Sequence, residues 1–301
     1  MPYAEAPTGK NRFMKTVPKL PWKGQLSAVE KPSSCIQDST LYSKINGFKG
    51  FSMLEDKEPF SEDCLYLNIW TPVDAFVKNP LKGNESVPIL VFFGHVDMYN
   101  PSTFVAASQV IVVTVNYRLG VFGFLKLAGI FPGNQGLSDQ NEALKWIKNN
   151  AKNMGGDPER ITIAGHGNDA SLASYHLFIK ESHDLYRNMI LQSGSPLMSS
   201  LRPIRSEDAN ERALRLVNKI GCGSDVKQCL QDSDKVAKAS SDLFQDMTNN
   251  NFITQANLKT SFPPCIDGNL LVNTPEELLS SGDFKQCSIL NGVTAHEGKF
   301  F

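Results

Sequence analysis

The sequence predicts an α/β fold in which a mostly parallel β-sheet is covered by helices. Two observations carry this prediction: short apolar runs rich in β-branched residues, and intervening segments whose apolar residues recur at helical spacing. The elements alternate along the chain from strand to helix to strand, which favours parallel strands joined by helical crossovers. With 301 residues, of which 41% are hydrophobic, the chain can bury a sizeable core, and we expect one domain over residues 1–301.

The first part of the chain, residues 1–60, is rich in Pro, Lys and Gly and lacks a sustained period, so we expect it to wrap irregularly around the rest. Two strands are predicted after it. Residues 87–93 form a continuous apolar run, which is typical of a parallel strand buried on both faces. Residues 109–117 form a second run, in which β-branched side chains favour a strand.

Helical spacing follows these strands. Between residues 137 and 154 apolar side chains fall along one stripe of a helix. Asp139 and Glu142 occupy its early turns, where the helix dipole stabilises acidic side chains. The Gly-Gly-Asp-Pro stretch at 155–158 ends this helix. The remaining expected elements are a strand at 160–164, a helix at 171–178, a strand at 188–191 and a mainly helical segment at 206–282.

Composition narrows the classes of function. The net charge of −1 gives no general field for nucleic acid or an anionic membrane. The longest apolar runs are far shorter than the roughly 18 residues that a transmembrane helix needs. The six cysteines are even in number and Asn84 begins a glycosylation sequon, but six cysteines would equally suit buried thiols, and a lone sequon often occurs by chance. The N-terminus has no signal-peptide pattern, so a secreted protein implies that the sequence lacks its beginning.

Eight segments, in one order across the chain, resemble the type-B carboxylesterase/cholinesterase family. They are PYAEAPTGKNRF (2–13), SEDCLYLNIW (61–70), NYRLG (116–120), GNQGLSDQ (133–140), GGDP (155–158), QSGS (192–195), IDG (266–268) and HEG (296–298). The resemblance implies an α/β-hydrolase fold that is incomplete here. It implies that the chain begins after the family's small N-terminal sheet and stops before the family's last third.

The resemblance also implies two disulfides. Cys35 and Cys64 match the family's first bonded pair, and Cys222 and Cys229 resemble its second, short-loop pair. Two further cysteines have no counterpart in the family and either pair with each other or stay free: Cys265 and Cys287.

The nucleophile of an α/β-hydrolase is a serine on a strained turn between a strand and a helix, in the motif G-x-S-x-G. The matching stretch begins at Gly165, and Gly167 takes the place of the serine. Glycine has no side-chain atom that can attack a carbonyl. Asp169 takes the place of the second glycine and brings a Cβ and a charge into the tightest part of the turn. We therefore expect that the chain does not hydrolyse esters.

Neighbouring residues are poor substitutes for the serine. Ser171 lies one helical turn beyond Gly167 and points elsewhere, so a packing or surface serine is the better interpretation. His166 could act as a base or ligand, but an exposed or hydrogen-bonded structural histidine explains it better. Asp169 lies two residues from the apex, which argues against a carboxylate nucleophile.

The other catalytic parts of the family are altered too. Where the family has His-Gly-Gly-Gly, this chain has Gly94 followed by His95, Val96 and Asp97, so larger side chains replace glycines that let substrate approach the oxyanion donors. Simple drift of an unrestrained loop explains this change equally well. Glu297 aligns with the catalytic acid, but all five histidines precede it, whereas the fold's order is nucleophile, acid, histidine. We expect a structural role for Glu297.

No cofactor or metal is expected. No glycine-rich phosphate loop precedes a helix, and no Cys/His spacing suggests zinc. His–Asp pairs at 95/97 and 166/169 would form a metal site only by chance.

Three functions remain open. The first is a non-catalytic binding or adhesion module, secreted or facing the outside of the cell, with a protein partner or small-molecule ligand and no nucleic acid. The second is a carboxylic-ester hydrolase with an unorthodox nucleophile, and the third is a non-functional gene fragment. The first is favoured because core and disulfide motifs persist while the elbow and oxyanion residues have both changed.

Overall fold

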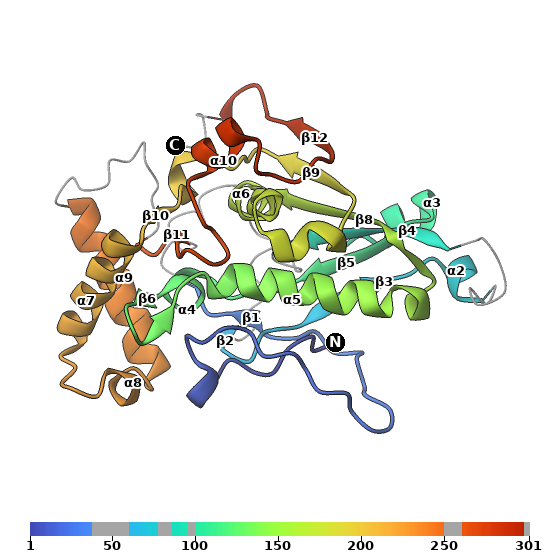
Figure 1. The fold of residues 1–301 in the computed structure, drawn as a ribbon. Helices are drawn as coiled ribbons and strands as arrows, with labels where there is room; N and C mark the ends of the chain where they lie inside the picture. Colours follow the sequence, from blue (N-terminus) through green and yellow to red (C-terminus); the bar gives the residue numbers. More distant parts are fainter. Residues whose placement is uncertain (38–59, 78–85, 95–99, 250–260, 298–301) are drawn as a thin grey trace.

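A six-stranded sheet forms the centre of the part of the chain that the computed structural model describes, which is residues 1–37, 60–77, 86–94, 100–249 and 261–297 (Figure 1). The strand order is β12-β9-β8-β4-β5-β3; the neighbours from β12 to β5 run parallel, and β3 pairs antiparallel with β5. The strands are β3 (Leu67–Trp70), β4 (Val87–Phe93), β5 (Ile111–Val115), β8 (Gly156–His166), β9 (Asn188–Gln192) and β12 (Ser288–Gly292). The predicted α/β fold with a mostly parallel sheet is confirmed.

Burial along the strands explains their apolar patterns. β5 has neighbours on both edges, and all five of its residues are buried. Its side chains meet packed layers on both faces of the sheet, so the sequence is continuously apolar rather than alternating. β12, at the edge, is exposed along its whole length. The strand predicted at 109–117 is shorter in the structure, where β5 spans Ile111–Val115. The strand predicted at 160–164 is longer, since β8 spans Gly156–His166.

Helices cover the sheet and gather in a second group at one end of the molecule (Figure 1). α5 (Gln135–Asn150) and α6 (Asn168–Ser174) pack against β8, while α7 (Ser206–Ile220) packs against α9 (Ser233–Asn249). The shorter helices are α2 (Val73–Val77), α3 (Ser102–Ser108), α4 (Gly120–Phe124), α8 (Val226–Cys229) and α10 (Pro275–Ser281).

The helix predicted at 137–154 consists of two parts. α5 continues into the 3₁₀ turn η5 (Ala151–Met154), and Gly155 ends it in the left-handed conformation (φ 84°). The other 3₁₀ turns are η1 (Gly9–Asn11), η6 (Tyr175–Leu177), η7 (Lys180–Leu185) and η8 (Ser199–Leu201). Three pairs of two-residue strands complete the fold: β1 (Ser34–Cys35) with β2 (Phe60–Ser61), β6 (Lys126–Leu127) with β7 (Phe131–Pro132), and β10 (Ile204–Arg205) with β11 (Cys265–Ile266).

A buried ion pair joins the end of β5 to α5. The Arg118 guanidinium donates to both carboxylate oxygens of Asp139, at 2.8 and 2.7 Å, and both side chains are almost fully buried. The Thr16 hydroxyl, from the N-terminal segment, donates to the same carboxylate at 2.6 Å. Asp139 was expected to interact favourably with the dipole of the helix from one of its early turns. It lies beyond the first turn of α5 and is instead the anion of this buried ion pair.

The cysteines pair as the resemblance implied. Cys35 is bonded to Cys64, and Cys222 is bonded to Cys229. The remaining two cysteines, which were expected either to pair or to stay free, are both free thiols. Cys265 is buried and Cys287 is half-buried. No helix of the described residues has the length and apolar character needed to cross a bilayer.

Candidate functional site at the turn after β8

The turn between β8 and α6 is a sharp elbow centred on Gly167. Gly167 has φ 60° and ψ −122°, a backbone conformation that residues other than glycine rarely adopt. Its amide donates to the Gln192 carbonyl at 2.8 Å, and its carbonyl accepts from the Ser171 amide at 3.1 Å. A Cβ placed at this residue would meet no atom of the described residues within 4 Å. The backbone thus presents position 167 to open space, but without a side chain.

Two glycines let the chain pass closely around this elbow. A Cβ at Gly165 would lie 2.6 Å from backbone atoms of Asp169 and Ala170. A Cβ at Gly194 would overlap the carbonyl oxygen of Gly167. Because neither position leaves room for a side chain, these glycines allow β8, the segment after β9 and α6 to meet at one point.

Asp169, the second residue of α6, turns its side chain into the protein. The Tyr117 hydroxyl donates a hydrogen bond to its Oδ1, and a Cβ at Gly94 would lie only 2.5 Å from its Oδ2. Burial raises the pKa of Asp169 to about 6, although the hydrogen bond from Tyr117 opposes that rise. A carboxyl group therefore lies directly against the first residue of the loop that follows β4.

Polar side chains continue behind this carboxyl. Gln140 of α5 lies beside Tyr117, and its Oε1 is 3.1 Å from Nε2 of the buried His176. The His176 ring stacks on Phe93 at the end of β4, with the ring centroids 5.5 Å apart. Burial lowers the pKa of His176 to about 3, so this imidazole is neutral at physiological pH. It has no charge to offer Asp169.

Glu297 lies at the exposed side of the elbow and is held by hydrogen bonds. The Ser193 hydroxyl donates to it at 2.7 Å, and the amide and hydroxyl of Thr294 donate at 2.8 and 2.9 Å. These bonds, the one from Ser193 first, lower the pKa of Glu297, and the nearby His166 adds to that effect. Glu297 is thus an oriented carboxylate beside position 167.

The neighbouring residues that were considered as replacements for the serine do not place a nucleophilic atom at the elbow apex. Ser171 is fully buried, and its hydroxyl is 3.4 Å from the Gly167 carbonyl and 3.1 Å from the Met198 sulfur. Its oxygen therefore points away from the open space at position 167. His166 is exposed.

Several predicted site residues lie outside the described residues. These are His95, Val96 and Asp97 of the altered oxyanion loop and Asn84 of the sequon. Among the residues that the structure describes, no group of three His, Cys, Asp or Glu is placed to hold a metal ion.

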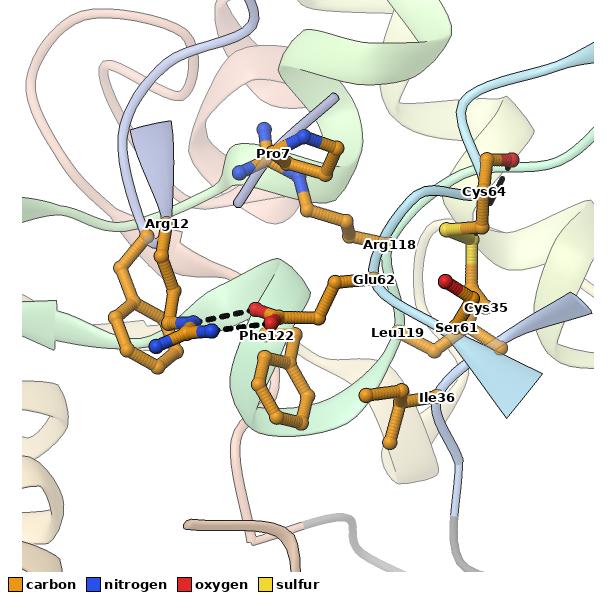
Figure 2. A pocket seen from close by; sticks show the side chains of 11 residues that line it. Pro7, Arg12, Cys35, Ile36, Ser61, Glu62, Cys64, Arg118, Leu119 and Phe122 are labelled. Atoms are coloured by element: carbon orange, nitrogen blue, oxygen red, sulfur yellow. Dashed lines mark hydrogen bonds and ion pairs between the residues drawn. A yellow bond between two sulfur atoms is a disulfide. The ribbon is translucent and has the colours of Figure 1, made fainter. Parts of the chain in front are cut away.

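A small cavity lies away from the elbow, beneath the N-terminal segment (Figure 2). Arg12 and Glu62 form a doubly hydrogen-bonded ion pair across it, and the Cys35–Cys64 disulfide lines the opposite wall. Its volume of about 10 Å³ is about the space of one water molecule. This cavity is a packing feature of the fold and has no room for an organic ligand.

A mostly parallel sheet, in which the strand β8 turns through a tight glycine-lined elbow into the helix α6, defines the chain as an α/β protein of the hydrolase type. The chain belongs to the carboxylesterase family, whose family model matches residues 1–301.

The chain is similar to acetylcholinesterases. It is 35% identical over 317 residues to that of Electrophorus electricus, 34% identical over 317 residues to that of Danio rerio and 34% identical over 313 residues to that of Bungarus fasciatus. These alignments cover 100% of this chain but only 47%, 47% and 49% of the relatives. The chain therefore spans about half the length of the curated relatives it matches.

Proposed function

We propose that this chain is a non-catalytic member of the carboxylesterase family that serves as an extracellular binding or adhesion module. The observation that carries the proposal is Gly167: the elbow keeps its geometry and its open space, but the residue at the apex has no nucleophilic atom.

The charge beside the elbow also opposes ester hydrolysis. Acyl transfer develops negative charge on the substrate oxygen, and losing one oxyanion donor typically costs about 2.7–4 kcal/mol. The Asp169 carboxyl lies against Gly94, where the loop that resembles the family's oxyanion loop begins. An ionised carboxylate there would repel the developing oxyanion.

Ester hydrolysis in this fold also requires a general base. An active member needs a histidine that Glu297 orients, and in this fold that histidine follows the acid in the chain. His176 is buried against Phe93 and Gln140, away from the exposed Glu297. Glu297 instead accepts its hydrogen bonds from Ser193 and Thr294, which supports a structural role at the edge of the sheet.

A binding role is consistent with what remains of the fold. Two disulfides are consistent with an extracellular location, and each is expected to stabilise the chain against unfolding.

The test is hydrolysis of a chromogenic short-chain ester by the purified protein, compared with a heat-treated sample. We expect equal rates. A rate above that control that survives purification to homogeneity would overturn the proposal and favour an ester hydrolase with an unorthodox nucleophile.

A matched variant makes this test sharper. Gly167→Ser/Asp169→Gly restores the serine and the small residue two positions beyond it. We expect this variant to stay at background, because the buried His176 bonds to Gln140 rather than to Glu297. A protein that cannot be refolded to a soluble monomer would favour the gene-fragment interpretation instead.

A further inference from the structure

The strand at one end of the sheet, β12, has an open edge. β12 pairs with β9 on one side and ends the strand order, so no strand of the described residues pairs with it on the other side (Figure 1). All of its residues are exposed. An open edge presents backbone N–H and C=O groups that can form hydrogen bonds to a further strand.

The bonds to β9 show which backbone groups of β12 face outward. The Gly292 carbonyl accepts from the Ser193 amide of the segment after β9, at 2.7 Å. Successive residues of a strand direct their N–H and C=O groups to opposite edges. Because Gly292 faces β9, its neighbours Asn291 and Val293 direct their backbone groups to the open edge, and so does Ile289.

This edge lacks the features that usually keep edge strands from pairing. Such strands are protected by charged side chains, by proline or by a β-bulge. Residues 287–294 contain no charged residue and no proline, and the register with β9 runs without a bulge from Ser288 to Gly292. Three of these residues are instead exposed apolar side chains: Ile289, Leu290 and Val293. The edge is therefore suited to pairing with another strand.

We propose that β12 pairs antiparallel with β12 of a second copy of this chain, about a two-fold axis at Asn291, and so joins two sheets into one. In this register Asn291 faces Asn291 of the second copy, and Ile289 of each copy faces Val293 of the other. All three residues direct their backbone groups to the open edge, as the hydrogen-bonded pairs of an antiparallel ladder require.

The side chains are self-complementary in this register. Two-fold symmetry places each residue opposite the residue that lies equally far on the other side of the axis. Ile289 and Val293 lie two positions on either side of Asn291 and on the same face of the strand, so the dimer contains two cross-strand pairs of β-branched apolar residues. Leu290 lies opposite Gly292, which leaves room for it. No like charges meet along the strand.

Sedimentation velocity of the 301-residue protein over a series of concentrations tests the association. We expect a monomer that becomes a dimer as the concentration rises. Asn291→Pro removes an outward N–H but no bond to β9, and an edge strand tolerates proline there. It should raise the dissociation constant at least about tenfold, because the symmetric pair loses two hydrogen bonds. Leu214→Lys changes an exposed leucine of α7 and should dimerise like the wild type.

Cysteine crosslinking in a Cys287→Ser background tests the register. The Cα atoms of a hydrogen-bonded antiparallel pair are about 5.5 Å apart, which a disulfide can span. Asn291→Cys should therefore form a covalent dimer on mild oxidation. Ile289→Cys alone should not, because its two copies lie four positions apart, about 13 Å along the strand. Mixed with Val293→Cys, it should form a covalent dimer.

A monomer at every concentration would overturn the proposal and leave the edge to a strand of a different protein. A dimer that Asn291→Pro does not weaken would also overturn it, as would Asn291→Cys crosslinking no better than Ile289→Cys. If Asn291→Pro does not fold, the crosslinking pattern decides. These readouts measure association alone, so their outcome is independent of whether the chain hydrolyses esters.

Discussion

The Ser193 hydroxyl donates a 2.7 Å hydrogen bond to Glu297, across 104 positions of the sequence. Ser193 itself has a positive φ of 53°, which is uncommon for a residue with a side chain. The contact fixes the end of β9 against the segment after β12, beside an elbow whose apex has no side chain. The surroundings of the elbow are thus held by specific hydrogen bonds, although the residue at its apex is glycine.

Removing the Ser193 hydroxyl should change the acidity of Glu297. Hydrogen bonds that favour the charged form hold its pKa below the ordinary value, and the bond from Ser193 is the largest of them. In Ser193→Ala the pKa of Glu297 should rise, while in Ser195→Ala, two residues away, it should stay where it is. Carboxyl titration by NMR measures both. An unchanged titration in Ser193→Ala would show that the hydrogen bond does not form in solution.

Substitution at the elbow apex should be tolerated. In the part of the chain that the structure describes, a Cβ at Gly167 meets no atom within 4 Å, so Gly167→Ser should lose only the backbone preference of glycine, about 1–3 kcal/mol in the free energy of unfolding. Gly165→Ala is the matched control, because its Cβ would overlap backbone atoms of the same turn, and it should lose about 3 kcal/mol or more. Urea unfolding compares them. Equal losses would contradict the open position of residue 167.

Breaking the buried pair of Arg118 and Asp139 should be costly. Arg118→Met leaves an unpaired carboxylate in the interior, and such a change typically lowers the free energy of unfolding by about 3–5 kcal/mol. Adding Asp139→Asn should recover part of this loss. The exposed pair of Arg215 and Glu211 is the control: Arg215→Met should cost less than about 0.5 kcal/mol. A small effect of Arg118→Met alone would show that Asp139 finds another partner.

The two disulfides should differ in their contribution to stability. In the chain-entropy picture a bridge stabilises by restricting the unfolded chain, so a longer loop gives more. Cys35 and Cys64 are 29 positions apart and Cys222 and Cys229 are 7 apart, which gives about 3.5 and about 2.5 kcal/mol. Paired Cys→Ser variants, unfolded in urea, test this order. A greater loss on removing the short loop would reject the entropic explanation.

The strands and long helices could be predicted from the sequence because their signal is local. The apolar run at 87–93 is β4, and the helical spacing at 137–154 gives α5 and η5. The end of the run at 109–117 was predicted less well, because the strand ends at Val115 although Asn116 and Tyr117 are still buried. The Asn116 amide continues the pairing by one bond, to the Tyr66 carbonyl just before β3.

The candidate site was predictable only in part. Motif positions identified Gly167 and Glu297, since each is defined by its neighbours in the sequence. The partners of these groups were missed. Tyr117 bonds to Asp169 from 52 positions away and Ser193 to Glu297 from 104, and no local period connects such pairs. Both partners do lie inside family-like segments, which was the one available signal.

The most direct test of the central claim is covalent labelling with a fluorophosphonate probe, read by intact-protein mass spectrometry beside an active serine hydrolase. If the glycine at position 167 leaves the elbow without a nucleophile, the mass of this protein should not change under conditions that label the control completely. A stoichiometric adduct on any side chain near the elbow would contradict the account.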